Sequence, residues 1–249
     1  METIEKSEYW LGLMIGNSRL HWAEFQKERL LKTWETDHFS REEIIKNWQE
    51  TYPLYFASVV PQQTELWQQV PQSTQLTLSH IPMADLYSSM GIDRALAALG
   101  AGETYGFPVL VIDAGTALTL TAINPERQLL GGAILPGLTM QFQSLQQKTA
   151  QLPALVLPSD LPSLWATDTT TAIESGILYV LLAGIKHFVE DWYAQYSQGA
   201  IALTGGDADI LFKYIKTQYP SLAKKMIIDK NLIFWGMRSL LSDLSKGKY

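Results

Sequence analysis

The chain carries the same strand-turn-strand pattern twice. Tyr9 to Ile15 is a short apolar run that ends at Gly16, and Val109 to Ile112 is a second apolar run that ends shortly before Gly115. A Ser or Thr closely follows each glycine, and another apolar run then begins, a pattern typical of a strand, a tight turn and a second strand. Because 99 positions separate Gly16 from Gly115, we expect two duplicated domains and not a solenoid of short repeats.

The spacing of apolar residues predicts most of the remaining elements. Third strands are expected at Leu30–Trp34 and Leu129–Leu135. From Thr169 onward apolar residues recur mostly every three or four positions, which predicts a long helix. Ser40 and Glu43 form a possible capping box ahead of another helix. The further expected elements are strands at Leu20–Phe25, Leu54–Val60, Leu118–Ile123 and Ala200–Leu203, helices at Ala95–Ala101, Leu138–Ala150 and Leu232–Leu244, and an ordered Pro-rich loop at Leu152–Pro162.

Composition excludes several classes of function. With 249 residues, of which 47% are hydrophobic, the chain is long and apolar enough to bury a sizeable core. The net charge of −6 and the absence of a dense basic run argue against a nucleic-acid or anionic-membrane surface. The chain has no Cys, and its four His never approach HExxH spacing, so disulfides, thiol nucleophiles and these zinc sites are excluded.

The sequence predicts a soluble cytoplasmic protein. Met1 to Ser7 is acidic and lacks the apolar stretch of a secretory signal. The longest apolar stretch lies within Ile177 to Ile185, which is shorter than the roughly 20 residues that a membrane helix needs.

The two predicted turns suit polyphosphate binding. Glycine lets the backbone approach phosphate oxygens, while exposed N–H groups and Ser or Thr hydroxyls donate hydrogen bonds to them. The alternative, that Gly16 and Asn17 only close a hairpin, is the commoner outcome for a single turn, but two matching turns weaken it. His21 alone is interpreted as an exposed or capped side chain, and the Trp22, Trp34 and Trp48 set as core.

Two acidic residues are candidates for chemistry. Asp113, at the end of a buried strand, must find donors or a cation to offset its desolvation, or else it caps its own turn. Asp93 and Arg94, at the start of an Ala-rich helix, are a potential base and anion clamp, or else an N-cap with a surface charge. No GxxxxGK[ST] sequence exists, so a P-loop is excluded, and Gly100–Gly102 lacks the preceding strand and the third glycine of a dinucleotide-binding fingerprint.

Seven short segments, in order and spacing, resemble the type III pantothenate kinases over nearly the whole chain. They are Ile15–Ser18 (IGNS), Ser58–Pro61 (SVVP), Gly91–Arg94 (GIDR), Asp113–Ala117 (DAGTA), Gly131–Gly137 (GGAILPG), Thr169–Gly176 (TTTAIESG) and Leu203–Asp207 (LTGGD).

This resemblance implies an α/β fold of two duplicated ribonuclease H-like domains, as in actin and sugar kinases, with a cleft between them. The expected domains are residues 1–102, with the first phosphate turn and the pantothenate loop, and residues 103–249, with the second phosphate turn. It further implies ATP-dependent phosphorylation of pantothenate, the first step towards coenzyme A, with Mg²⁺ and a monovalent cation (K⁺ or NH₄⁺), by a homodimer.

The resemblance also implies roles for individual residues. Asp93 is similar to the proton acceptor, Asp113 to the residue that holds the monovalent cation, and Thr116 to an ATP contact. The residues that correspond to pantothenate contacts are Gly91, Ile92, Asp93, Arg94 and Thr169, and those that correspond to the first phosphate turn are Met14, Ile15, Gly16, Asn17, Ser18, Arg19, Leu20 and His21.

One position departs from the family pattern. The first turn usually reads DxGNT, but here Met14 stands at the first position and Ser18 at the last. Methionine removes a carboxylate expected to face magnesium and phosphates, which leaves the ion to water, phosphate oxygens and other acids. Two alternatives therefore stay open: a catalytically silent regulatory relative that acts through protein contacts, and a kinase for another acceptor such as a sugar.

Overall fold

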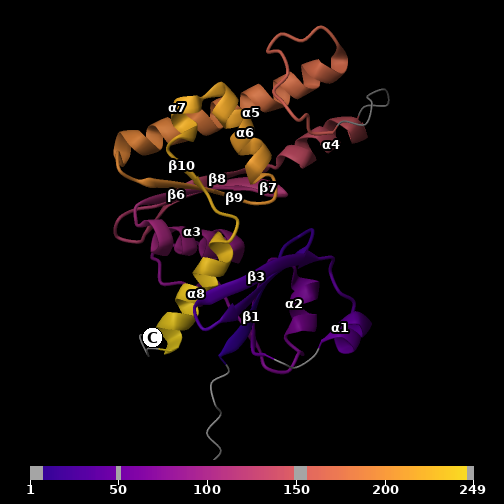
Figure 1. Ribbon diagram of the computed structural model, residues 1–249, viewed down its shortest axis with the longest axis vertical. Helices are drawn as coiled ribbons and strands as arrows, with labels where there is room; N and C mark the ends of the chain where they lie inside the picture. The colour runs from indigo at the N-terminus through magenta and orange to yellow at the C-terminus, as the bar shows by residue number, and fades with distance from the viewer. Residues whose placement is uncertain (1–7, 49–51, 149–155, 246–249) are drawn as a thin grey trace, which may run out of the picture. The chain divides into compact units, whose positions relative to one another are not determined.

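The computed structural model describes residues 8–48, 52–148 and 156–245 (Figure 1). The interpretation of residues 1–7, the predicted helical end at Ala150 and the first part of the predicted Pro-rich loop lie outside these ranges.

Two five-stranded sheets share one connectivity. The first is built from β1 (Tyr9–Ile15), β2 (Leu20–Gln26), β3 (Arg29–Thr36), β4 (Leu54–Ser58) and β5 (Ser73–Gln75) in the order β3-β2-β1-β4-β5. The second is built from β6 (Val109–Ala114), β7 (Ala117–Ile123), β8 (Leu129–Pro136), β9 (Ala200–Thr204) and β10 (Met226–Ile228) in the order β10-β9-β6-β7-β8. In each sheet the first strand pairs antiparallel with the second and parallel with the fourth. The predicted duplication is confirmed.

Helices follow the strands in both halves. They are α1 (Arg41–Asn47), α2 (Pro61–Trp67), α3 (Ile92–Tyr105), α4 (Leu138–Lys148), α5 (Thr169–Gln195), α6 (Ala208–Gln218), α7 (Pro220–Ala223) and α8 (Leu232–Ser245), with a 3₁₀ turn at Leu78–His80. The capping box predicted for α1 is present, because the Ser40 hydroxyl accepts from the Glu43 N–H while the Glu43 carboxylate accepts from the Ser40 N–H.

The compact units differ from the predicted domains at the C-terminus. The first unit contains residues 1–103 and 232–249, and the second contains residues 104–231. Helix α8, which the sequence assigned to the second domain, therefore belongs to the first unit. The physical reason is a close crossing of α3 and α8, where a Cβ atom at Gly100 would collide with the Leu232 carbonyl and one at Gly236 with the Leu96 carbonyl.

The core of the first unit is rich in tryptophan. Trp22 stacks on Trp34, with ring centroids 5.8 Å apart, and meets Trp67 edge to face at 5.3 Å. Trp48 also packs against this cluster, so the prediction that these tryptophans form core is confirmed.

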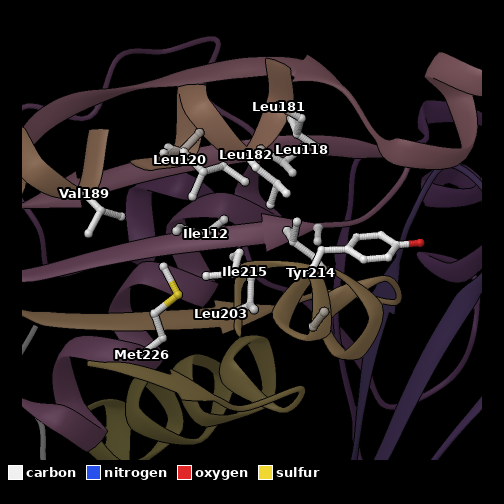
Figure 2. Close-up of a cluster of buried hydrophobic side chains, with 14 of the residues drawn as sticks. Ile112, Leu118, Leu120, Leu181, Leu182, Val189, Leu203, Tyr214, Ile215 and Met226 are labelled. Atoms are coloured by element: carbon white, nitrogen blue, oxygen red, sulfur yellow. The ribbon is translucent and has the colours of Figure 1, made fainter. Parts of the chain in front are cut away.

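In the second unit α5 packs on the sheet. Figure 2 shows Leu181, Leu182 and Val189 of this helix beside Leu118 and Leu120 of β7. Over an 18-residue window α5 reaches a mean hydropathy of 1.5, so by length and composition alone it is apolar enough to cross a membrane. One third of that window is buried inside the protein.

Candidate active site

The first predicted phosphate turn is a tight hairpin between β1 and β2. The Gly16 N–H donates to the Arg19 carbonyl at 3.0 Å, and Ile15 pairs with Leu20 on either side of the turn. Asn17, Ser18 and Arg19 are exposed, so the tip of this hairpin is accessible to a ligand. It has the backbone and side-chain donors that phosphate binding needs.

Three of the eight residues predicted for this turn are core residues. Met14 is only 2% exposed, and Ile15 and Leu20 are fully buried. Met14 lies on the same face of β1 as Gly12, whose added Cβ would meet Met237 of α8 at 3.3 Å. Any contact of these three residues with phosphate is therefore through the backbone.

Two histidines flank Gly16. The Nε2–H of His38 donates to the Gly16 carbonyl at 2.8 Å. The ring of His21 lies on the turn as well, since a Cβ added to Gly16 would be 3.6 Å from its Nε2. His21 Nδ1 is 3.1 Å from the Glu35 carboxylate, and the Arg19 guanidinium is 3.8 Å from the same carboxylate.

Sequence reasoning did not select Glu35 or His38. The signal for Glu35 is the register of β2 and β3, which places it directly opposite His21. His38 has no such signal, because it follows β3 and reaches the turn through the folded chain.

Asp93 and Arg94 lie in the first turn of α3. The helix begins at Ile92, so Asp93 is inside it and not its N-cap, and Arg94 is 5% exposed and not a surface charge. The Arg94 N–H donates to the Asp93 carboxylate at 2.8 Å, and its guanidinium donates to the Tyr87 hydroxyl at 2.6 Å. The N-cap interpretation is wrong.

Burial raises the pKa of the Asp93 carboxyl above its usual range. The Arg94 N–H and the Arg94 charge oppose this shift without cancelling it. Gly91 permits the arrangement, because a Cβ atom there would strike the Asp93 carboxylate. A half-buried carboxyl with a raised pKa and a buried guanidinium beside it is typical of a catalytic acid or base.

The second predicted turn joins β6 to β7 in the other unit. The Gly115 N–H donates to the Ala117 carbonyl at 3.1 Å, and Thr116 is exposed at the tip. Asp113, near the end of β6, pairs in register with Thr204 of β9. Its carboxylate lies against Gly205, where a Cβ atom would strike both that carboxylate and Ala114.

The LTGGD segment supplies two features that support this turn. Gly205 has a positive φ of 94°, a conformation that favours glycine. The Asp207 N–H donates to the Ala114 carbonyl at 2.8 Å, which links the start of α6 to the end of β6. Burial raises the pKa of the Asp207 carboxyl.

Thr169 is the exposed first residue of α5. The helix is capped by Asp168, whose carboxylate accepts from the Thr171 N–H at 3.0 Å. The predicted site residues thus divide between the units: the first phosphate turn and the Gly91–Arg94 loop lie in the first, and Asp113, Thr116 and Thr169 in the second.

No preassembled metal cluster is present in the part of the chain that the structure describes. No three Asp, Glu, His or Cys side chains gather there closely enough to hold an ion.

Solved structures with low sequence identity share this fold. A Baf family protein from Campylobacter jejuni, described as a putative transcriptional activator, aligns over 95% of this chain and 99% of its own with a TM-score of 0.66 and 22% identity. The activator of 2-hydroxyisocaproyl-CoA dehydratase from Clostridium difficile, with bound ADPNP, aligns over 96% and 97% with a TM-score of 0.55 and 10% identity. MreB5 of Spiroplasma citri, bound to AMPPNP, aligns over 97% and 98% with a TM-score of 0.53 and 10% identity. The expected α/β fold of the actin and sugar-kinase type is confirmed.

Comparison of sequences identifies the family, which the comparison of folds does not. The sequence pattern of the family described as type III pantothenate kinase matches residues 10–191. A type III pantothenate kinase from Nostoc sp. is 44% identical over 95% of both chains, and one from Synechocystis sp. is 46% identical over 95% of this chain and 91% of its own. The matching segments, the duplicated fold and these relatives agree, and the chain belongs to the type III pantothenate kinase family.

Proposed function

We propose that this protein transfers the γ-phosphoryl group of ATP to the terminal primary hydroxyl of pantothenate, the first step of coenzyme A biosynthesis. Family membership over nearly the whole chain supports the substrate and the reaction. The observation that carries the mechanism is the half-buried Asp93 carboxyl at the start of α3, with its raised pKa and its buried Arg94 neighbour.

Asp93 orients the attacking hydroxyl and accepts its proton. A primary alcohol is a poor nucleophile, so its oxygen must lose the proton as the bond to phosphorus forms. The raised pKa of Asp93 makes it a stronger base than an exposed aspartate, and its hydrogen bond to the Arg94 N–H fixes the direction of the carboxylate. As the bond from the hydroxyl oxygen to the γ-phosphorus forms, the bond from that phosphorus to the bridging oxygen breaks and ADP leaves. The proton passes to a carboxylate oxygen of Asp93, which releases it to solvent after the products dissociate.

Pantothenate binds at the Gly91–Arg94 loop and at Thr169. The buried guanidinium of Arg94, held by the Tyr87 hydroxyl, supplies positive charge for the substrate carboxylate. The alternative is that Arg94 holds a dimer together. The Michaelis constant for pantothenate distinguishes the two roles, because Arg94→Lys raises it only if the guanidinium contacts the substrate.

ATP binds through the two turns, with residues 14–21 in the first unit and Thr116 in the second. Exposed N–H groups and hydroxyls at the hairpin tips donate to phosphate oxygens. Asp113 would hold the monovalent cation. This cation, and a magnesium ion bound together with ATP, would supply positive charge beside the transferred phosphoryl group.

The protein works as a homodimer in the cytoplasm. The outward face of α5 carries Gly176, Val180, Gly184 and Phe188 at intervals of four residues, with Val180 73% exposed. Nothing lies within 4 Å of a Cβ atom built on either glycine. A helix that is apolar on its outer as well as its core-facing side is typical of one that another surface covers.

A coupled ATP assay on the purified full chain tests the proposed function. We expect phosphorylation of pantothenate that depends on K⁺ or NH₄⁺, and no comparable activity with sugars. The silent regulatory alternative is not favoured by the relatives, which are named as kinases. Failure to phosphorylate pantothenate under every cation condition would reject the proposal and revive that alternative.

A further inference from the structure

The first phosphate turn has no carboxylate of its own. Residues 14–21 contain no Asp or Glu, and Met14 is buried in the core. An acidic side chain that the structure does bring to this turn is Glu35 of β3, and its two carboxylate oxygens already face Arg19 and His21. A divalent cation would have to compete with both of them.

Glu35 holds these partners on the exposed side of the hairpin. Glu35 and His21 are direct cross-strand partners of β3 and β2, with 3.1 Å between Oε1 and Nδ1. Arg19, at the end of the turn, is 3.8 Å from the other carboxylate oxygen. All three side chains are about half exposed, so each can reach a ligand at the turn without a rearrangement of the core.

The His21 ring has a defined orientation. An ionised carboxylate only accepts hydrogen bonds, so Nδ1 carries the hydrogen that points to Glu35. Nε2 is then the edge next to Gly16, where it lies 3.6 Å from a Cβ atom built on that glycine. His38 approaches the same residue and donates to its carbonyl, so Gly16 has one histidine ring bonded to it and a second beside it.

We infer that the first turn of this enzyme binds phosphate with the guanidinium of Arg19, which Glu35 positions beside His21, in place of a metal-binding carboxylate. The inference rests on the proposed function, because it assigns the phosphates of ATP to this turn.

Chemistry favours Arg19 as the principal contact. A guanidinium presents five N–H donors in a planar fork that matches two phosphate oxygens. An exposed ion pair as long as 3.8 Å contributes little to stability, so Arg19 can exchange the Glu35 carboxylate for a phosphate at small cost. Glu35 keeps His21 in place during the exchange, which makes Glu35 a positioning residue and not a catalytic one.

Steady-state kinetics of matched variants test the inference. A charge-assisted hydrogen bond is worth about 1.5 to 3 kcal/mol. We therefore expect Arg19→Ala to raise the Michaelis constant for ATP by about tenfold or more, Arg19→Lys to restore part of the loss, and Glu35→Gln to raise it by about threefold. The Michaelis constant for pantothenate should change by less than about twofold in all three.

The same hairpin provides the controls. Arg29 is an exposed arginine at the opposite end of β3. Glu24 lies away from the turn and forms an ion pair with Lys32, with 2.8 Å between the two charged groups. Arg29→Ala and Glu24→Gln should leave both Michaelis constants unchanged. Thermal melting of every variant separates a loss of phosphate contact from a loss of folding.

Calorimetric titration with inorganic tripolyphosphate without Mg²⁺ separates this inference from the proposed function. We expect wild-type protein and Arg29→Ala to bind it alike, and Arg19→Ala to bind it at least about tenfold more weakly. If the wild type binds tripolyphosphate through Arg19 but does not phosphorylate pantothenate, the proposed function is wrong and the inference about phosphate binding at the first turn is supported. If Arg19→Ala matches Arg29→Ala in both tripolyphosphate affinity and ATP Michaelis constant, the inference is wrong.

Discussion

The Asp93 carboxyl should increase turnover and lower the stability of the folded protein. We expect Asp93→Asn to lower turnover at least about a hundredfold, the scale usual for a general base. Because burial raises its pKa, the folded protein binds this proton more tightly than the unfolded chain does. Stability therefore falls as pH rises from the unfolded pKa near 4 through the raised folded pKa, and the loss is complete above it.

Urea unfolding between pH 4 and 8 measures this contribution. Asp93→Asn should unfold at the same or a higher urea concentration than the wild type at pH 8, with a smaller decline across the range. Glu65→Gln removes an exposed carboxyl on α2 and should follow the wild-type curve. Full turnover in Asp93→Asn would show that another group takes the proton.

Met14 should not tolerate an aspartate, the residue that the resemblance led us to expect at its position. Its side chain is buried beside α8, so Met14→Asp places a carboxylate in a core without a built partner. We expect a loss of about 3 to 5 kcal/mol, the range for an uncompensated buried charge, and no gain in turnover. Met14→Leu conserves volume and should cost less than about 1.5 kcal/mol. A stable and faster Met14→Asp enzyme would contradict this reading of the turn.

The sequence predicted site residues that stand in recognisable segments, and it missed those that depend on pairing. Asp93 and Asp113 follow from short motifs at the ends of apolar runs. Glu35 is an ordinary charged residue on an exposed strand until the register of β2 and β3 places it opposite His21. The burial of Met14 also required the structure, because the position of α8 decides which side of β1 is covered.

The crossing of α3 and α8 links fold and chemistry, because α3 also carries Asp93 at its first turn. Gly100→Ala would drive a methyl group into the backbone of Leu232 and Gly236, which cannot rotate away as a side chain can. We expect a loss of about 1 to 3 kcal/mol from overpacking, together with reduced catalytic efficiency as α3 shifts. Gly206→Ala adds the same methyl where nothing lies within 4 Å and should leave the melting temperature nearly unchanged. Equal melting temperatures for both variants would show that α3 and α8 can move apart to accept the methyl group without loss of stability.

Long apolar patterns were predicted well and short or weakly patterned elements were not. The strands from β1 to β3 and β6 to β8, and helices α5 and α8, all follow their predicted ranges closely. Helix α2 was missed because Pro61 reads as the end of a strand, although proline is equally suited to a first helical position. Strands β5 and β10 have three residues each and exist only through their neighbours.

The division of the chain into units could not be obtained from the order of its elements. Duplication suggested a single cut after residue 102, but α8 crosses back to the first unit over a separation of about 130 residues from α3. The two glycines at that crossing carry no sign of their pairing in the sequence, since each looks like an ordinary small residue within a helix.

The outward face of α5 around Val180 should hold two copies of the chain together. Its core-facing residues, including Leu181, Leu182 and Val189, are buried in the second unit, while Val180 faces outward on the opposite side and Phe188 is exposed at the edge of the buried face. The glycines between them leave room for a close approach of a second helix, and covering Val180 removes apolar surface from water at about 25 cal/mol per Å².

Light scattering after gel filtration measures the result. We expect the wild-type protein to run at about twice the 28.0 kDa chain mass, and Val180→Lys to run at about the mass of one chain, because a lysine against its own symmetry mate places like charges in an apolar contact. Ile45→Lys changes an equally exposed apolar residue on α1 of the first unit and should remain dimeric. If Val180→Lys keeps the wild-type mass while Ile45→Lys loses it, the dimer forms through the first unit, and the apolar outer face of α5 then requires a different partner.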